Sequence, residues 1–360
     1  MRRTPGFDYY SKVMMPEGRQ SCKMKKVLLL ITLLITLGCS FPLQVTLGTP
    51  TAIPALTPTP GPTVAPQTPP EPGTEQNPLI LALAPNPHPT DPVIAAGDVL
   101  AAYLEERTGL RIVTVIPASE AVLVDSLAKG NAHIASLSPY AFVMARGDNS
   151  VTALLARVRN GEMFYGAQIL INREGEFTAY FDEARGENTV DAATALNQFA
   201  DKKPCWSDEF SPSGYVVPLG LLNQSQVTTR TGAFLEGQPN VVRGVYADDI
   251  CDFGATFVDT RENPVLEADY PDVMDKVLVA WRIPEIIPYE NISMSSSLPF
   301  EMRRNVQRAF LDFMSTPEGK AAMQTVYGFD EMSPVEDAVY AEFIGYVNAS
   351  GINLPDLLDQ

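Results

Sequence analysis

The segment 210–222, FSPSGYVVPLGLL, places small hydroxyl residues directly before an apolar, helix-like run. The first turn of a helix leaves backbone N–H groups unpaired and carries partial positive charge, so such a turn can hold an anion. Ser211 and Ser213 add hydroxyl donors, and Gly214 lets the backbone approach a ligand closely. The same residues also suit an ordinary helix cap with proline in the first turn. The sequence therefore predicts either an anion-binding turn or a helix cap here.

Residue types that catalyse reactions form no recognisable pattern in this chain. The sequence contains no nucleophile elbow, no phosphate-binding P-loop and no paired cysteine and histidine. Neighbouring acids such as Asp248 and Asp249 are expected to be solvated in so acidic a chain. Only His88 and His133 could help to hold a metal, and no ligand spacing appears. We therefore expect no enzyme activity, no metal site and no cofactor.

The elements that must position the candidate residues alternate between strands and helices from residue 79 onward. Short apolar runs at 79–85, 110–117 and 132–139 read as buried strands, and segments with helical spacing lie between them. Gly109 marks the end of the first helix and Ser119 the N-cap of the next. This alternation predicts a parallel sheet with helices on both faces. Ligands of such sheets lie at the carboxyl ends of the strands, here the segments PNPHP, PAS and SLSPY.

The N-terminal region has the pattern of an export signal. Met24, which may be the true start, precedes two lysines and an apolar run that ends before Gly38 and Cys39. The run is shorter than the roughly 20 residues that a membrane span needs. A cysteine at this position resembles the lipid-bearing residue of bacterial lipoproteins, although Thr36 and Leu37 depart from the usual lipobox. We expect residues 1–38 to be the signal region, with lipidation of Cys39; a plain cleaved signal or an uncleaved anchor is the alternative.

Composition constrains the remaining chain. Residues 39–78 read as a lipid anchor followed by a Pro- and Thr-rich linker, which favours extended polyproline II structure. The formal charge of −17 argues against nucleic acid as a partner, because phosphate backbones attract basic residues. Cys205 and Cys251 are expected to pair, since thiols in an oxidising compartment more often form disulfides than stay free. Two buried, unpaired thiols are the alternative.

Beyond the linker, the chain resembles a known family in several motifs that follow in order. These are LALAPNPHP, VLAAYLEERTGLRI, SLAKGNAHIASLSPYAFVMA, FYGAQILINRE, SPSGYVVPLGLL, DDICDFGATFVD and SLPFEMRRNVQRAFLDFMSTPEGKAAM. They look like the phosphate-, phosphite- and phosphonate-binding proteins of ABC transporters. The resemblance implies the two-lobed α/β fold of type 2 periplasmic binding proteins, with a ligand cleft between the lobes. Two crossover hinge strands are expected near 167–174 and 277–287.

The same resemblance implies the division of the chain and its ligand contacts. Lobe 1 would comprise residues 79–171 and 279–360, and lobe 2 residues 172–278. We call residues 211–214 the serine turn. In the family the matching turn binds the phosphonate oxygens; here Pro212 replaces the middle residue and removes a hydroxyl and an N–H. Glu120 occupies a region in which the family places a ligand-contacting tyrosine. The expected contacts are Ser211, Ser213, Gly214, Tyr215, Ser138, Tyr140, Asp259, His88 and Glu120.

Each of these residues also has an ordinary structural role. Asp259 suits the turn at the end of a strand, and His88 suits a loop. Tyr165 and Trp206 could line the cleft or belong to the core between the lobes.

The function implied is that of a solute-binding protein. We expect a monomer, tethered to the outer face of the cell membrane as a lipoprotein, that presents a phosphonate, phosphite or phosphate to an ABC transporter permease. The alternatives are a sensory module that reports its ligand to a signalling receptor, and a binding protein for another small organic solute.

Overall fold

The computed structural model describes residues 70–358 of the chain. The signal region, Cys39 and most of the linker therefore lie outside the described residues. The last part of the expected linker lies within them and contacts the folded part, because the backbone N–H of Arg111 donates to the carbonyl of Gly73 at 2.7 Å. No helix of the described part is long and apolar enough to span a membrane.

The first of two large sheets contains the strands expected from the sequence. Its strand order is β13-β4-β12-β3-β1-β2. The strands β1, β2 and β3 are parallel, as predicted, whereas β12 runs antiparallel to both of its neighbours, so the sheet is mixed. The bounds are β1 (Leu79–Ala82), β2 (Ile112–Val115), β3 (Ile134–Leu137), β4 (Val151–Arg157), β12 (Asn291–Ser295) and β13 (Met332–Pro334).

Helices cover this sheet, and two predicted helix boundaries are confirmed. Gly109 ends α2 with a φ of 70°, a left-handed conformation that glycine adopts without strain. The hydroxyl of Ser119 accepts a hydrogen bond from the N–H of Val122 and so caps α3. The helices are α2 (Asp91–Thr108), α3 (Glu120–Ala128), α4 (Pro139–Gly147), α10 (Phe300–Met314) and α11 (Pro317–Tyr327). Apolar strand residues such as Leu79 and Leu81 are completely buried among them.

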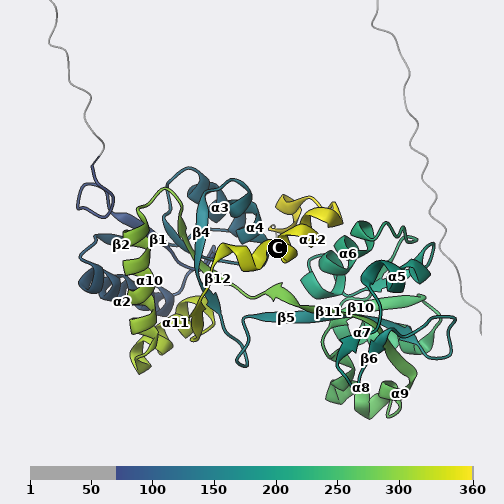
Figure 1. Cartoon of the computed structure of the whole chain (residues 1–360). Helices are drawn as coiled ribbons and strands as arrows, with labels where there is room; N and C mark the ends of the chain where they lie inside the picture. The colour runs from purple at the N-terminus through teal and green to yellow at the C-terminus, as the bar shows by residue number, and fades with distance from the viewer. Residues whose placement is uncertain (1–69, 359–360) are drawn as a thin grey trace, which may run out of the picture. The chain divides into compact units, whose positions relative to one another are not determined.

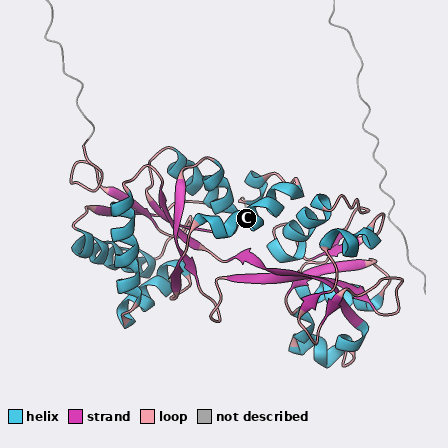
Figure 2. Cartoon of the chain, in the orientation of Figure 1, coloured by secondary structure: helices cyan, strands magenta, loops and turns pink. Residues whose placement is uncertain are grey.

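The second sheet has the order β11-β5-β10-β8-β9. Its strands are β5 (Phe164–Asn172), β8 (Pro204–Trp206), β9 (Ala233–Phe234), β10 (Phe253–Phe257) and β11 (Val277–Pro288). The short strands β6 (Phe181–Asp182) and β7 (Glu187–Asn188) form a separate pair. The associated helices are α5 (Ala192–Leu196), α6 (Val217–Gln224), α7 (Gln238–Ala247), α8 (Pro264–Asp269) and α9 (Val273–Lys276). Figure 2 shows helices around the strands of this part too.

Two long strands connect the sheets. The chain leaves the first sheet after β4 and enters β5, and it returns through β11 to β12 (Figure 1). β5 and β11 pair antiparallel from Phe164 opposite Pro288 to Asn172 opposite Val277. The expected crossover segments thus coincide with these strands. The expected lobe boundaries, after residues 171 and 278, fall inside them, because both strands bond to the second sheet along their length.

The C-terminal helix α12 (Ala341–Ser350) contacts the second sheet's helix α6. The packing is close, because a Cβ atom at Gly220 would lie 2.0 Å from the carbonyl oxygen of Tyr346. The side-chain amide of Asn223 donates to the carbonyl of Ala349 at 2.9 Å. Residues 341–350, expected in lobe 1, therefore bridge to the other part of the chain.

A disulfide joins Cys205 and Cys251, with 5.6 Å between the Cα atoms. Cys205 lies in β8, and Cys251 lies two residues before β10. The parallel pairing of β8 with β10 brings Cys205 opposite Gly254, which positions the two thiols side by side.

Candidate functional site

A cavity of about 520 Å³ adjoins the serine turn. Its lining residues come from both parts of the chain that β5 and β11 connect. They therefore belong to segments that are far apart in sequence. We call it the serine-turn cavity. Its lining residues are Pro139, Arg157, Arg159, Asn160, Tyr165, Ser211, Pro212, Ser213, Gln238, Phe257, Val258, Pro288, Tyr289 and Glu290.

Ser211 is both a helix cap and a lining residue of the cavity. It caps the π-helical turn Pro212–Val216, which continues directly into α6. Its Oγ accepts one hydrogen bond from the N–H of Gly214 at 3.0 Å and another from Nε2 of Gln238 at 2.9 Å. A serine hydroxyl has two acceptor lone pairs and one donor hydrogen. Both lone pairs are used, and the hydroxyl donates to no acceptor in the part of the chain that the structure describes. The two roles predicted as alternatives are therefore compatible.

Ser213 also lines the cavity, and only 3% of its surface is exposed. Its hydroxyl hydrogen bonds with that of Tyr165. Burial raises the pKa of Tyr165 far above its usual range, so this phenol stays neutral at physiological pH. The cavity wall thus carries two neutral hydroxyl groups that share one hydrogen bond, which leaves one hydroxyl hydrogen to donate to a ligand.

Gly214 and Tyr215 do not line the cavity. A Cβ atom at Gly214 would lie 2.0 Å from Oγ of Ser207, so glycine allows the turn to pack against that residue. The ring of Tyr215 packs against Trp206 and Phe234, with ring centroids 5.5 and 4.9 Å away. In this structure both residues pack on the side of the turn that faces away from the cavity lining.

Two arginines that were not expected from the sequence also line the cavity. Nη1 of Arg157 forms an ion pair with Oε2 of Glu290 at 2.7 Å. Arg159 is exposed and forms no ion pair within residues 70–358; its guanidinium lies 6.0 Å from the centre of the Tyr289 ring. The lining residues therefore include two arginines and one glutamate, a net charge of +1 in a chain whose net charge is −17.

Asp259 lies one residue beyond the lining residue Val258 and is engaged by the protein itself. Its Oδ2 contacts Nη2 of Arg261 at 2.7 Å and Nη2 of Arg282 at 3.6 Å, and its Oδ1 accepts from Gln168 at 2.8 Å. Burial alone would raise the pKa of Asp259, but the hydrogen bonds from Arg261 and Gln168 outweigh it and lower the pKa. The carboxylate is therefore charged and already neutralised by arginine.

Ser138, Tyr140 and Glu120 lie beside the cavity without lining it. Ser138 caps α4 and donates to Oε2 of Glu120 at 2.7 Å. The hydroxyl of the buried Tyr140 donates to the carbonyl of Phe210 at 3.0 Å, which links α4 to the residue before the serine turn. Burial raises the pKa of Glu120, and the negative charge of Glu290 adds to this rise.

Neither His88, an expected contact, nor His133 lines the cavity. His88 is exposed in the loop before α2 and does not line the cavity. Nδ1 of His133 accepts a hydrogen bond from the backbone N–H of Ile80. Residues 70–358 contain no group of side chains suited to hold a metal ion. Trp206, the other aromatic considered, is buried against Phe253.

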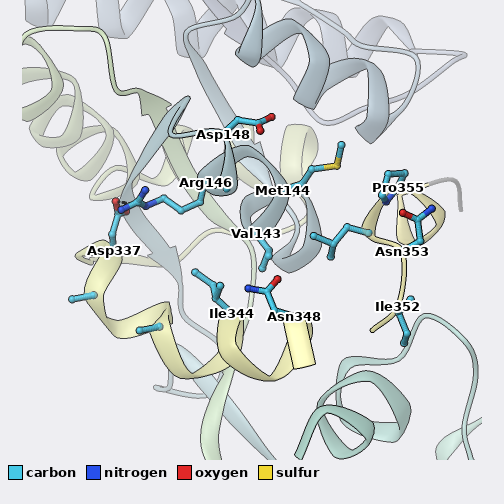
Figure 3. A pocket seen from close by; sticks show the side chains of 14 residues that line it. Val143, Met144, Arg146, Asp148, Asp337, Ile344, Asn348, Ile352, Asn353 and Pro355 are labelled. Carbon is cyan, nitrogen blue, oxygen red and sulfur yellow. Dashed lines mark ion pairs between the residues drawn. The ribbon is translucent and has the colours of Figure 1, made fainter. Parts of the chain in front are cut away.

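A larger cavity of about 1000 Å³, shown in Figure 3, contains no residue of the serine turn in its lining. It is bounded by the end of α4, by α12 and by the chain that follows α12. Arg146 and Asp337 form an ion pair at its edge, with 3.0 Å between Nε and Oδ2. This cavity shares no lining residue with the serine-turn cavity.

The fold agrees with comparisons to known proteins. The family of ABC transporter, phosphonate, periplasmic substrate-binding proteins matches residues 86–340. The chain belongs to this family. The family is one of periplasmic substrate-binding components of ABC transporters rather than of enzymes. The two sheets joined by β5 and β11 give this chain a two-lobed α/β fold.

Two proteins similar to this chain illustrate the range of its relatives. The phosphate-import protein PhnD of Mycolicibacterium smegmatis is 28% identical over 156 residues, which cover 43% of this chain and 44% of that protein. The match thus spans less than half the length of the curated relative. The solved structure of XAC2383 from Xanthomonas citri bound to ATP has a TM-score of 0.51 at 14% identity, and covers 77% of this chain and 98% of that one. At this identity the likeness shows the fold alone.

Proposed function

We propose that this member of the family captures a small phosphorus oxyanion, a phosphonate, phosphite or phosphate, in the serine-turn cavity for an ABC importer. The observation that carries the proposal is the net positive charge of this cavity in a strongly acidic chain. Arg159 provides a cation without a carboxylate partner in the described part of the chain. A cation of this kind attracts an anion and forms strong, charge-assisted hydrogen bonds with its oxygens.

The serine turn supplies the complementary donors. The hydroxyl hydrogen of Ser211 has no acceptor among the described residues, and a helix N-terminus favours negative charge. Ser213 and Tyr165 add hydroxyl groups on the same wall. We infer that oxygens of the anion accept from these hydroxyls, while Arg159 neutralises the charge from the β4–β5 connection. The name of the mycobacterial relative, a phosphate-import protein, agrees with an oxyanion ligand.

We also propose that the protein is a monomer tethered to the outer face of the cell membrane through a lipid on Cys39. The tether would keep a ligand-loaded protein near the permease. Support comes from the pattern of the first 39 residues and from the proline-rich segment that follows.

Calorimetric titration of the mature chain with phosphate, phosphite and methylphosphonate tests the proposal. At least one of these anions should bind, and Arg159→Gln should weaken its binding about ten- to hundredfold, as expected for a lost hydrogen bond between charged groups. Arg304→Gln is the matched control, because Arg304 is also exposed, lies over the ring of Phe300, forms no ion pair within residues 70–358 and lies outside the cavity. Equal affinities of the two variants, or no binding of any of the three anions, would contradict the proposal.

A further inference from the structure

Three aromatic side chains, those of Tyr165, Phe257 and Tyr289, line the serine-turn cavity. Tyr165 lies in β5 and pairs with Ile287 of β11, while Phe257 of β10 pairs with Ala167 of β5. Tyr289 follows two residues after Ile287, and its ring stacks on that of Tyr165 with centroids 5.1 Å apart. The register of three neighbouring strands thus brings three rings to the same end of β5.

One of these rings presents a free apolar surface. Phe257 is 39% exposed although it is a large hydrophobic residue that lines the cavity. Its backbone N–H donates to Oε1 of Gln238, the same side chain that donates to Ser211. The position of Phe257 is therefore coupled to the turn that holds the free hydroxyl donor.

The size of the cavity exceeds what an inorganic anion needs. Pockets of about 300–1,000 Å³ enclose drug-sized organic ligands. The cavity volume of about 520 Å³ falls in this range, whereas phosphate or phosphite has only four or five non-hydrogen atoms. Three prolines, Pro139, Pro212 and Pro288, and the aromatic residues make much of the remaining wall apolar.

We propose that the preferred ligand is an organic phosphonate or phosphate ester with an aromatic substituent, whose ring packs beside Phe257 and Tyr289. This inference rests on the proposed function, because it needs the anionic group to occupy the serine turn. The anionic group then sets the ligand's orientation, and the aromatic rings select its substituent. Aromatic rings attract one another beyond the area that they bury, so the substituent should increase affinity.

Phenylphosphonate and methylphosphonate form a suitable pair of probes, since they share a head group and differ in one substituent. In calorimetric titrations of the mature chain, phenylphosphonate should bind at least about tenfold more tightly. Phe257→Ala should reduce that preference about two- to tenfold, the range expected for one aromatic pair. Phe234→Ala is the matched control, because Phe234 is also 39% exposed in the same sheet but does not line the cavity.

The outcomes separate this inference from the function on which it rests. Equal binding of the two probes by the unmodified protein would overturn the aromatic preference and leave oxyanion capture intact. A preference for phenylphosphonate that survives both Phe257→Ala and Tyr289→Leu would also overturn it, because the rings would then not be responsible. Absence of binding of either probe, together with phosphate and phosphite, would instead contradict the proposed function.

Discussion

Substituting Ser211 by aspartate should abolish ligand binding while preserving the helix cap. Aspartate is about as good an N-cap residue as serine, so its carboxylate can still accept from the N–H of Gly214 and from Gln238. It cannot donate a hydrogen bond when ionised, and its charge repels an anion. The lost hydrogen bond to a charged ligand amounts to about 1.5–3 kcal/mol, or roughly ten- to hundredfold in affinity, and repulsion adds to that loss.

Ser211→Ala provides the comparison, because it removes both roles together. It should lower stability by about 1 kcal/mol through the lost cap and should also weaken binding. Ser213→Ala should weaken binding with little loss of capping, since Ser213 caps no helix. Thr316→Ala, which removes the cap of α11, serves as the control for stability alone.

Calorimetric titration gives the affinity of each variant, and thermal unfolding without ligand gives its stability. The reasoning predicts that Ser211→Asp keeps most of the melting temperature and loses binding, whereas Thr316→Ala lowers the melting temperature and keeps binding. Normal affinity in Ser211→Asp would refute it. The serine turn would then be structural, and the anion would have to bind elsewhere.

Three further predictions concern the anchor, the disulfide and the buried acid beside the cavity. Cys39→Ser should release the protein from membranes and remove metabolically incorporated palmitate; unchanged labelling would count against lipidation. Mass mapping of the non-reduced protein should find Cys205 linked to Cys251, and loss of this link across 46 residues should lower stability by up to about 4 kcal/mol; two alkylated thiols would disprove the link. Burial raises the pKa of Glu120, so ionisation of this carboxyl opposes folding once the pH rises above the ordinary glutamate pKa of about 4.3. Glu120→Gln should therefore raise the melting temperature more at pH 8 than at pH 4. An equal change at both pH values would argue against this.

Local features of the fold could be predicted from the sequence because their causes are local. The αL glycine at 109 and the N-cap serine at 119 each act within a few residues, and both are confirmed. The serine turn at 211 is similar, since its hydroxyl caps the turn that follows it. Three strands of the first sheet, β1, β2 and β3, also follow from short apolar runs, whereas its other three strands run antiparallel to their neighbours.

The charges of the site could not be predicted in the same way. Arg159 comes to face the serine turn only because two crossover strands connect segments that are some 50 residues apart in sequence. Asp259 was expected near the ligand, yet its partner Arg261 lies only two residues along the chain and neutralises it. An acid and an arginine two residues apart say little about which groups they contact until the strands are placed.

The contact of the C-terminal helix α12 with α6 could not be predicted from the sequence either. Nothing in the apolar pattern of residues 341–350 distinguishes a helix that packs on its own sheet from one that packs on α6. The close contact at Gly220 is possible because glycine has no side chain. The sequence shows the glycine but does not show that the backbone of Tyr346 occupies the space beside it.

A crystal structure of the mature protein with methylphosphonate would test the central proposal most directly. The account predicts phosphonate oxygens within hydrogen-bond distance, about 2.5–3.2 Å, of the Ser211 hydroxyl and of the Arg159 guanidinium. A phosphonate bound in the larger cavity beside α4 and α12, or at any site that leaves the Ser211 hydroxyl without an acceptor, would contradict it.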